Sequence, residues 1–193
     1  MRPHDVLQLD IAGTPQDWLS FEEAASLIYA GSVGWSFGPK IATLRGGVSR
    51  LSGEQSTLDI PAVIATSGQS KINLADQIPP LSRYNYKLFA RDRHMCAYCG
   101  EVFHTKKLTR EHVFPRAQGG KYVWNNVVTA CSPCNNRKGN RTPEAANMKL
   151  LYTPYTPNWF EDMLLQRGGR RILADQMEFL MAKVPMNSRL RLA

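Results

Sequence analysis

Apolar and polar residues alternate at the start of the chain and then change to a helical period. Val6-Leu-Gln-Leu-Asp-Ile11 alternates almost residue by residue, which predicts a first strand with one buried face. Residues 21–30 instead place apolar side chains three and four positions apart, which predicts an amphipathic helix. Ser20 and Glu23 form a capping box in front of this helix, and Gly31 suits its carboxyl end.

Short apolar runs separated by turn residues continue this region. Four such runs predict further strands, at residues 33–37, 41–44, 48–51 and 59–66. Glycine-containing stretches at 13–17 and 45–47 predict turns. Pro80 closes the region, so we expect residues 1–80 to form a small α+β lead-in that packs on the central part of the protein.

The second half of the chain predicts a hairpin and several helices. Residues 108–113 and 126–130 suit two paired strands, and Ser132 or Pro133 begins a helix directly after them. Thr142 followed by proline has the N-cap and N1 pattern of another helix start. Two more helices are expected, at 159–165 and 172–181.

These patterns predict an α+β protein of three parts. The lead-in is followed by a central domain over residues 81–150. Residues 151–193 form a helical C-terminal extension. The length of 193 residues suits one domain with extensions of this size.

Positive charge is concentrated in one segment of the chain. The formal net charge is +8, but residues 83–141 hold twelve basic against three acidic residues, while residues 1–82 hold five against eight. A local excess of this kind favours a polyanionic partner through phosphate contacts and counterion release. A solvated basic face is the alternative explanation.

The sequence predicts neither a membrane helix nor a secretory signal. Apolar residues make up 43% of the sequence, enough for a core, but no run approaches the ~18 apolar residues of a membrane helix. The first ten residues, MRPHDVLQLD, lack an apolar segment behind a basic start. We therefore expect a cytoplasmic protein without a membrane partner.

The four cysteines form two Cys-x-x-Cys pairs, Cys96/Cys99 and Cys131/Cys134. Two thiolates three residues apart can reach one metal ion from a tight turn, and two such turns complete a tetrahedral zinc site. Since a cytosolic chain has little use for disulfides, this spacing indicates structural Zn²⁺. Two disulfides or four unrelated thiols are the alternatives.

The residues between and after the cysteine pairs resemble the HNH endonuclease superfamily. The matching runs are Leu108-Thr-Arg-Glu-His-Val-Phe-Pro-Arg-Ala-Gln-Gly-Gly120, Trp124-Asn-Asn-Val-Val-Thr-Ala-Cys131 and Cys134-Asn-Asn-Arg-Lys-Gly139. By position the motif residues are His112, Asn126 and Asn135, so the third is asparagine rather than histidine. Glu111 stands where many members have Asp or His. The resemblance implies a ββα-metal nuclease core, in which a two-stranded hairpin and a helix surround one catalytic metal ion.

The resemblance also implies a role for each motif residue. Glu111 and Asn135 would bind a catalytic Mg²⁺ or Mn²⁺, and His112 would be the general base that takes a proton from water. Asn126 would orient the loop or the ring of His112. These residue types suit the chemistry, because a hard cation prefers oxygen ligands and a histidine titrates near neutral pH.

The implied reaction is the hydrolysis of DNA phosphodiester bonds, by nicking or double-strand cleavage, with 5′-phosphate and 3′-hydroxyl products. The geometry raises one difficulty, because consecutive residues of a regular strand point to opposite faces. Glu111 and His112 can therefore serve one phosphate only if the strand twists or ends there.

Basic residues within the motif are the candidates for nucleic-acid contact. They are Arg110, Arg116, Lys121, Arg137, Lys138 and Arg141. We expect double-stranded DNA as the partner, and the sequence leaves open a homodimer or an accessory protein. Two other functions also stay open: a zinc-stabilised DNA-binding module without catalysis, and an RNA-directed nuclease.

Overall fold

The structure is a computed structural model that describes residues 4–68, 78–167, 172–186 and 188–191. The chain divides into two compact units, residues 1–77 with 169–183 and residues 78–168 with 184–193. Each unit has its own sheet. Residues 151–193, which the sequence grouped as one extension, are shared between the units.

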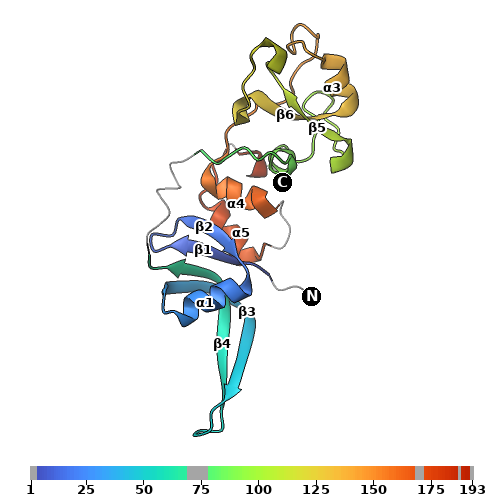
Figure 1. Ribbon diagram of the computed structural model, residues 1–193. Coiled ribbons are helices and arrows are strands. Elements are labelled where there is room, and N and C mark those ends of the chain that lie inside the picture. The colour runs from blue at the N-terminus through green and yellow to red at the C-terminus, as the bar shows by residue number, and fades with distance from the viewer. Residues whose placement is uncertain (1–3, 69–77, 168–171, 187, 192–193) are drawn as a thin grey trace. The chain divides into compact units, whose positions relative to one another are not determined.

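The first unit is built on a four-stranded sheet in the order β2-β1-β4-β3. Its strands are β1 (Val6–Asp10), β2 (Pro15–Leu19), β3 (Val33–Val48) and β4 (Gln55–Thr66). β1 runs antiparallel to β2 and parallel to β4, while β3 and β4 form a long antiparallel hairpin. Figure 1 shows this hairpin extending as a two-stranded ribbon beyond the other two strands.

Two helices cover this sheet. α1 (Phe21–Tyr29) buries Ala24 and Ala25 against Ile60 and Ile64 of β4. Its capping box is confirmed, because the Ser20 side chain accepts a hydrogen bond from the Glu23 amide and the Glu23 carboxylate accepts one from the Ser20 amide. α5 (Ala174–Met181) packs on β3 and β4. Within it, the buried Gln176 donates hydrogen bonds to the carbonyls of Asp5 and Ala62.

Two predicted turns in this unit are displaced. The turn placed at residues 13–17 is shorter, because β2 already begins at Pro15. The turn placed at 45–47 and the strand placed at 48–51 are wrong, since β3 runs through Gly46 and Gly47 to Val48 and the chain reverses over residues 49–54. A Cβ atom on Gly46 would lie 2.3 Å from Ser56 Oγ, so this glycine permits close cross-strand packing rather than a reversal.

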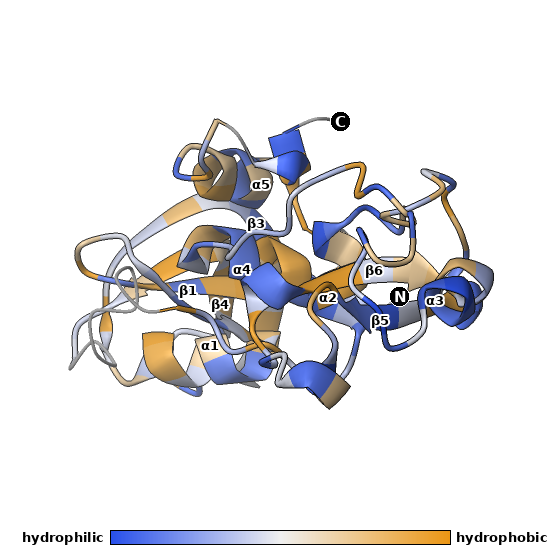
Figure 2. Cartoon of the chain, turned by 90° about the horizontal axis from the view of Figure 1, so that it is seen from above, coloured by the Kyte–Doolittle hydropathy of each residue, from blue (hydrophilic) through white to orange (hydrophobic). Residues whose placement is uncertain are grey.

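The second unit combines a two-stranded sheet with short helices. Its elements are α2 (Tyr86–Arg91), β5 (Leu108–His112), β6 (Val127–Cys131), α3 (Ser132–Lys138) and α4 (Trp159–Arg167), with 3-10 turns at Thr105–Lys107, Arg116–Gln118, Trp124–Asn126 and Arg189–Arg191. β5 and β6 pair antiparallel, with Glu111 opposite Val128, and α3 follows β6 without a gap. In Figure 2 β6 is mainly hydrophobic and α3 mainly hydrophilic.

Buried polar groups fix β6 within this unit. Arg91 is fully buried, forms an ion pair with Asp92 and donates to the carbonyls of Trp124 and Val127. The Asp92 carboxylate in turn accepts a hydrogen bond from the Thr129 amide at 2.8 Å. A buried ion pair of this kind needs every hydrogen bond filled to offset its desolvation. The Arg91–Asp92 pair thereby joins the end of α2 to β6, the strand that leads into α3.

One predicted helix is absent. Residues 143–147 make a single turn, in which the Thr142 hydroxyl accepts a hydrogen bond from the Ala145 amide. Asn147 then has a φ of 52°, a left-handed conformation that ends the turn before a helix forms. Among the described residues, none of the helices combines the length and the apolar character needed to cross a membrane.

Candidate active site and metal centre

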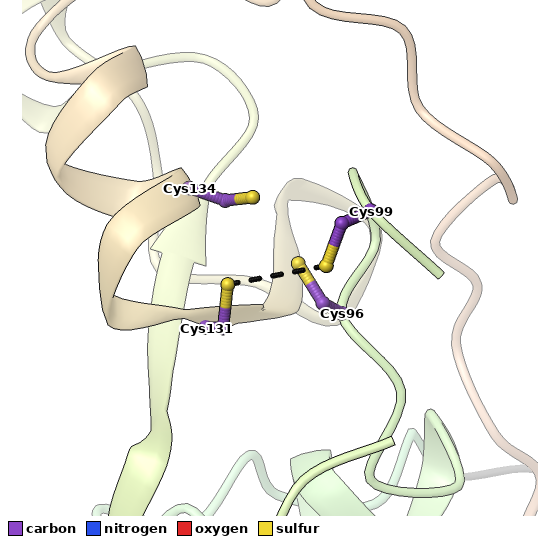
Figure 3. Close-up of side chains that lie close together, drawn as sticks. All are labelled: Cys96, Cys99, Cys131 and Cys134. Carbon is purple, nitrogen blue, oxygen red and sulfur yellow. Dashed lines mark hydrogen bonds between the residues drawn. The ribbon is translucent and has the colours of Figure 1, made fainter. Parts of the chain in front are cut away.

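The two Cys-x-x-Cys pairs meet at one point. Cys131 closes β6 and Cys134 lies in the first turn of α3, while Cys96 and Cys99 come from the turn that precedes β5 (Figure 3). The four sulfur atoms all lie within 4.8 Å of one another, and all four thiols are free. Tetrahedral zinc–thiolate bonds of ~2.3 Å place sulfur atoms nearly 4 Å apart. The Cys99–Cys131 sulfur distance of 4.0 Å agrees with that geometry.

The charges around these sulfurs also suit a cation. Burial would raise the pKa of Cys96, but the amides of Cys99, Cys131 and Tyr98 donate hydrogen bonds that lower it to about 7. Burial and the neighbouring thiolates raise the pKa of Cys99 and Cys134. Zn²⁺ binds the thiolate form, and four free thiols gathered within 4.8 Å of one another are consistent with structural zinc.

A second feature is an open pocket of about 390 Å³ at the end of β5. Glu111, His112 and Asn135 all line it, together with Arg116. The structure thus brings three of the four predicted motif side chains to one cavity. β5 ends at His112, which lets two consecutive residues border the same space despite the alternation of a strand.

Glu111 reaches the pocket from the side of the strand that faces α3. It is 7% exposed, and its Oε1 atom lies 2.5 Å from the ammonium of Lys138. Burial raises the pKa of Glu111, while the hydrogen bond from Lys138 acts in the opposite direction. The pair satisfies one carboxylate oxygen inside the protein.

Asn135 is oriented by a short chain of hydrogen bonds. The Thr109 hydroxyl donates to the Ala130 carbonyl at 3.0 Å, so it can only accept from Asn135. Asn135 therefore directs Nδ2 towards Thr109, at 2.8 Å. Its carbonyl oxygen is left for the pocket that the residue lines.

His112 lies on the opposite side of β5, against an aromatic neighbour. Its ring centroid is 6.2 Å from that of Tyr122, and the Tyr122 ring is covered by the Arg110 guanidinium at 4.5 Å. Within the described part of the chain, His112 Nε2 is buried without a hydrogen-bond partner. Burial lowers the pKa of His112, and the charges of Arg116, Arg110 and Lys138 lower it further.

Asn126 contacts the loop that follows His112. Its Oδ1 accepts from the Phe114 amide at 2.9 Å, and its Nδ2 donates to the carbonyls of Phe114 and Lys121 at 3.2 and 2.9 Å. Its own carbonyl accepts from the Val113 amide. Of the two roles expected for Asn126, these hydrogen bonds favour orientation of the loop over orientation of the ring.

The six predicted phosphate-binding residues lie in different surroundings. The exposed members are Arg116, Lys121, Arg137 and Arg141. Arg110 is only partly exposed and donates to the Arg83 carbonyl and the Asn85 side chain. Lys138 is fully buried and bound to Glu111, so we withdraw it from the phosphate contacts: a lysine with no exposed surface cannot meet a nucleic acid there.

Sequence reasoning missed several residues around the pocket. Asn136, Gly139 and Asn140 line it together with the motif residues, and Tyr122 covers His112. Asn136, Gly139 and Asn140 lie within or beside the matching motif, so their position in and after α3 was a usable signal. Tyr122 had no such signal, because only the folded loop brings it to the histidine.

Comparison with known proteins supports the same region of the chain. Residues 96–151 match the family model described as HNH endonuclease. A stretch of 78 residues is 35% identical to the CRISPR-associated endonuclease Cas9 of Corynebacterium diphtheriae. That stretch makes up 40% of this chain but only 7% of the Cas9 protein. The family-model match covers the segment that holds the four cysteines and the pocket residues.

Proposed function

We propose that this chain is a metal-dependent endonuclease that hydrolyses DNA, because residues 96–151 match the HNH endonuclease family model. The observation that carries the proposal is the convergence of Glu111, His112 and Asn135 on one open pocket beside a four-cysteine cluster. β5, β6 and α3 would then form the ββα-metal core, with zinc fixing the start of α3.

Glu111 and Asn135 would hold the catalytic cation. They offer a carboxylate and an amide carbonyl oxygen, the donor types that Mg²⁺ and Mn²⁺ accept, and the open pocket leaves room for water in the remaining positions. A divalent cation bound there supplies Lewis-acid chemistry to the scissile phosphate. The donor set therefore fits the cofactor that the family resemblance implies.

His112 would act as the general base. A base must be neutral to accept a proton, and the lowered pKa of His112 keeps the ring neutral at pH 7. Tyr122 limits the movement of the ring, and Asn126 holds the loop behind it. Arg116, exposed at the pocket, would contact the phosphate.

A plasmid-cleavage assay tests the proposal. Wild type and His112→Ala would be incubated with supercoiled DNA in EDTA, Mg²⁺ or Mn²⁺, with His104→Ala as a matched control because His104 is exposed. We expect metal-dependent nicking or linearisation by wild type and His104→Ala, and a loss of about 10²–10⁴-fold in His112→Ala.

Other outcomes identify the competing functions. A wild type that shifts DNA on a gel but cuts it with none of the metals would favour a zinc-stabilised DNA-binding module. Cleavage of RNA oligonucleotides in preference to DNA of the same sequence would make the chain an RNA-directed nuclease. Equal activity of wild type and His112→Ala would remove His112 as the base.

A further inference from the structure

Lys138, the last residue of α3, is a fully buried lysine. Its Nζ donates to Glu111 Oε1 at 2.5 Å and to the His112 carbonyl at 2.9 Å. Removing an ammonium group from water costs several kcal/mol, which only good pairing offsets. An apolar side chain of similar length would fill this space without that cost, so packing alone does not explain the residue.

Lys138 contacts Glu111 and His112, two consecutive residues that in a regular strand would point to opposite faces. Both residues nevertheless line the same pocket. Thr109 and Glu111 face α3, as their hydrogen bonds to Asn135 and Lys138 show. His112 faces the other way, towards Tyr122. Lys138 binds the side chain of one residue and the backbone of the next, and so fixes the place where β5 ends.

The contact with Glu111 uses one of its two oxygens. A carboxylate can accept hydrogen bonds or bind a cation through either oxygen. With Oε1 held by Lys138, and the His112 backbone also hydrogen-bonded to the carboxylate, the side-chain torsions of Glu111 are restrained where the residue lines the pocket. Such restraint matters for glutamate, which has one more rotatable bond than aspartate.

We propose that Lys138 is a positioning residue, whose ammonium group holds Glu111 and the His112 peptide so that metal ligand and base meet in one pocket. The inference rests on the proposed nuclease function. It assigns Lys138 a role through Glu111 and not through the phosphate. The partners that orient a metal ligand commonly change metal affinity or activity by about 10–100-fold when they are removed.

A competing explanation makes the opposite prediction. If Lys138 only occupied the place of the cation, its charge would repel an incoming metal ion, and its removal would tighten metal binding. If it positions Glu111, its removal weakens metal binding, because the carboxylate loses its orientation. The sign of the change in Mn²⁺ affinity therefore separates the two roles.

The experiment is a calorimetric Mn²⁺ titration without DNA. Wild type, Lys138→Met and Lys138→Gln would be compared with Lys149→Met, a matched variant of an exposed lysine. Circular dichroism and the bound zinc content would establish that each variant is folded. We expect the Mn²⁺ dissociation constant to rise about tenfold or more in both Lys138 variants and to stay unchanged in Lys149→Met.

Cleavage kinetics add a second readout. Because Lys138 is buried, its variants should lower kcat and leave KM for DNA unchanged. A raised KM with an unchanged kcat would instead indicate a phosphate contact and overturn the proposal. Tighter Mn²⁺ binding, or unchanged binding in folded variants, would also overturn it.

A measurement on the wild type covers the case in which both variants fail to fold. In ¹⁵N-labelled protein, the ammonium signal of Lys138 should persist at saturating Mg²⁺, because Lys138 stays on Glu111. Loss of that signal on Mg²⁺ binding would overturn the positioning role. If the wild type binds no divalent cation, the proposed function is overturned as well. If the wild type binds the cation and cuts DNA normally, a negative result concerns Lys138 alone.

Discussion

Replacing Asn126 by alanine tests whether one side chain holds the loop of residues 113–122 beside the pocket. The side chain makes three hydrogen bonds to this loop, two with the backbone of Phe114 and one with the carbonyl of Lys121. Alanine removes all three and leaves the Phe114 amide without its acceptor. The loop should therefore open more often while the sheet beneath it stays closed.

The size of the effect follows from these three contacts. A protein hydrogen bond contributes about 0.5–1.5 kcal/mol net, and partly exposed bonds such as these belong in the lower half of that range. The sum is about 2 kcal/mol for the closed loop. A change of that size shifts a local opening equilibrium by about 30-fold.

Amide hydrogen exchange measures this opening directly. In Asn126→Ala, exchange at the Phe114 amide should be about 30-fold faster than in wild type. The Thr129 amide, which is held by Asp92, serves as an internal reference and should not change. Asn125→Ala is the matched control, because Asn125 is its exposed neighbour.

The same variant should cut DNA more slowly, since the loop carries Arg116 and Tyr122 to the site. Exchange at Phe114 that stays within twofold of wild type would refute the assignment of Asn126 as the residue that holds the loop. Faster exchange with unchanged cleavage would refute the link between loop closure and activity.

Two further predictions concern the cysteine cluster and the histidine. Cys99→Ser, or chelation of zinc from wild type, should unfold the second unit, because binding of a structural metal ion contributes directly to folding; retained ellipticity and normal cleavage in the zinc-free protein would contradict this. The pH profile of cleavage should fall on its acidic side below pH 6.5, the ordinary pKa of histidine, because a lowered pKa keeps His112 neutral until the pH drops further. The profile is to be measured at saturating metal, and an acidic limb centred above pH 6.5 would show that a different group controls it.

The cysteine cluster was predictable from its local spacing, and the motif residues were predictable from the resemblance to HNH endonucleases. A Cys-x-x-Cys turn or a capping box such as Ser20–Glu23 needs only a few neighbouring residues to specify its geometry. The structure places the four cysteines together, and it gathers Glu111, His112 and Asn135 at one pocket.

Other features were not readable because they depend on contacts distant in sequence. Gly46 was expected to be a turn residue, yet it lies within β3 beside the Ser56 side chain of the opposite strand. Lys138 was expected to contact nucleic acid, because nothing in its neighbours shows that Glu111 lies beside it, 27 positions earlier. The helix expected after Thr142 fails for a different, local reason: Thr142 and Pro143 start a turn, but Asn147 adopts a left-handed conformation that ends it.

The position of the cysteines affects how far the length of the loop between β5 and β6 can change. A zinc ion on all four would tie residue 99 to residue 131 and so enclose β5, the loop and β6 in a closed ring of chain. Closing a loop of roughly this length removes about 3–4 kcal/mol of chain entropy from the unfolded state on a polymer estimate. Doubling such a loop then adds only about 0.6 kcal/mol. Residues 116–123 could therefore lengthen and acquire new substrate contacts while Glu111 and Asn135 keep their places.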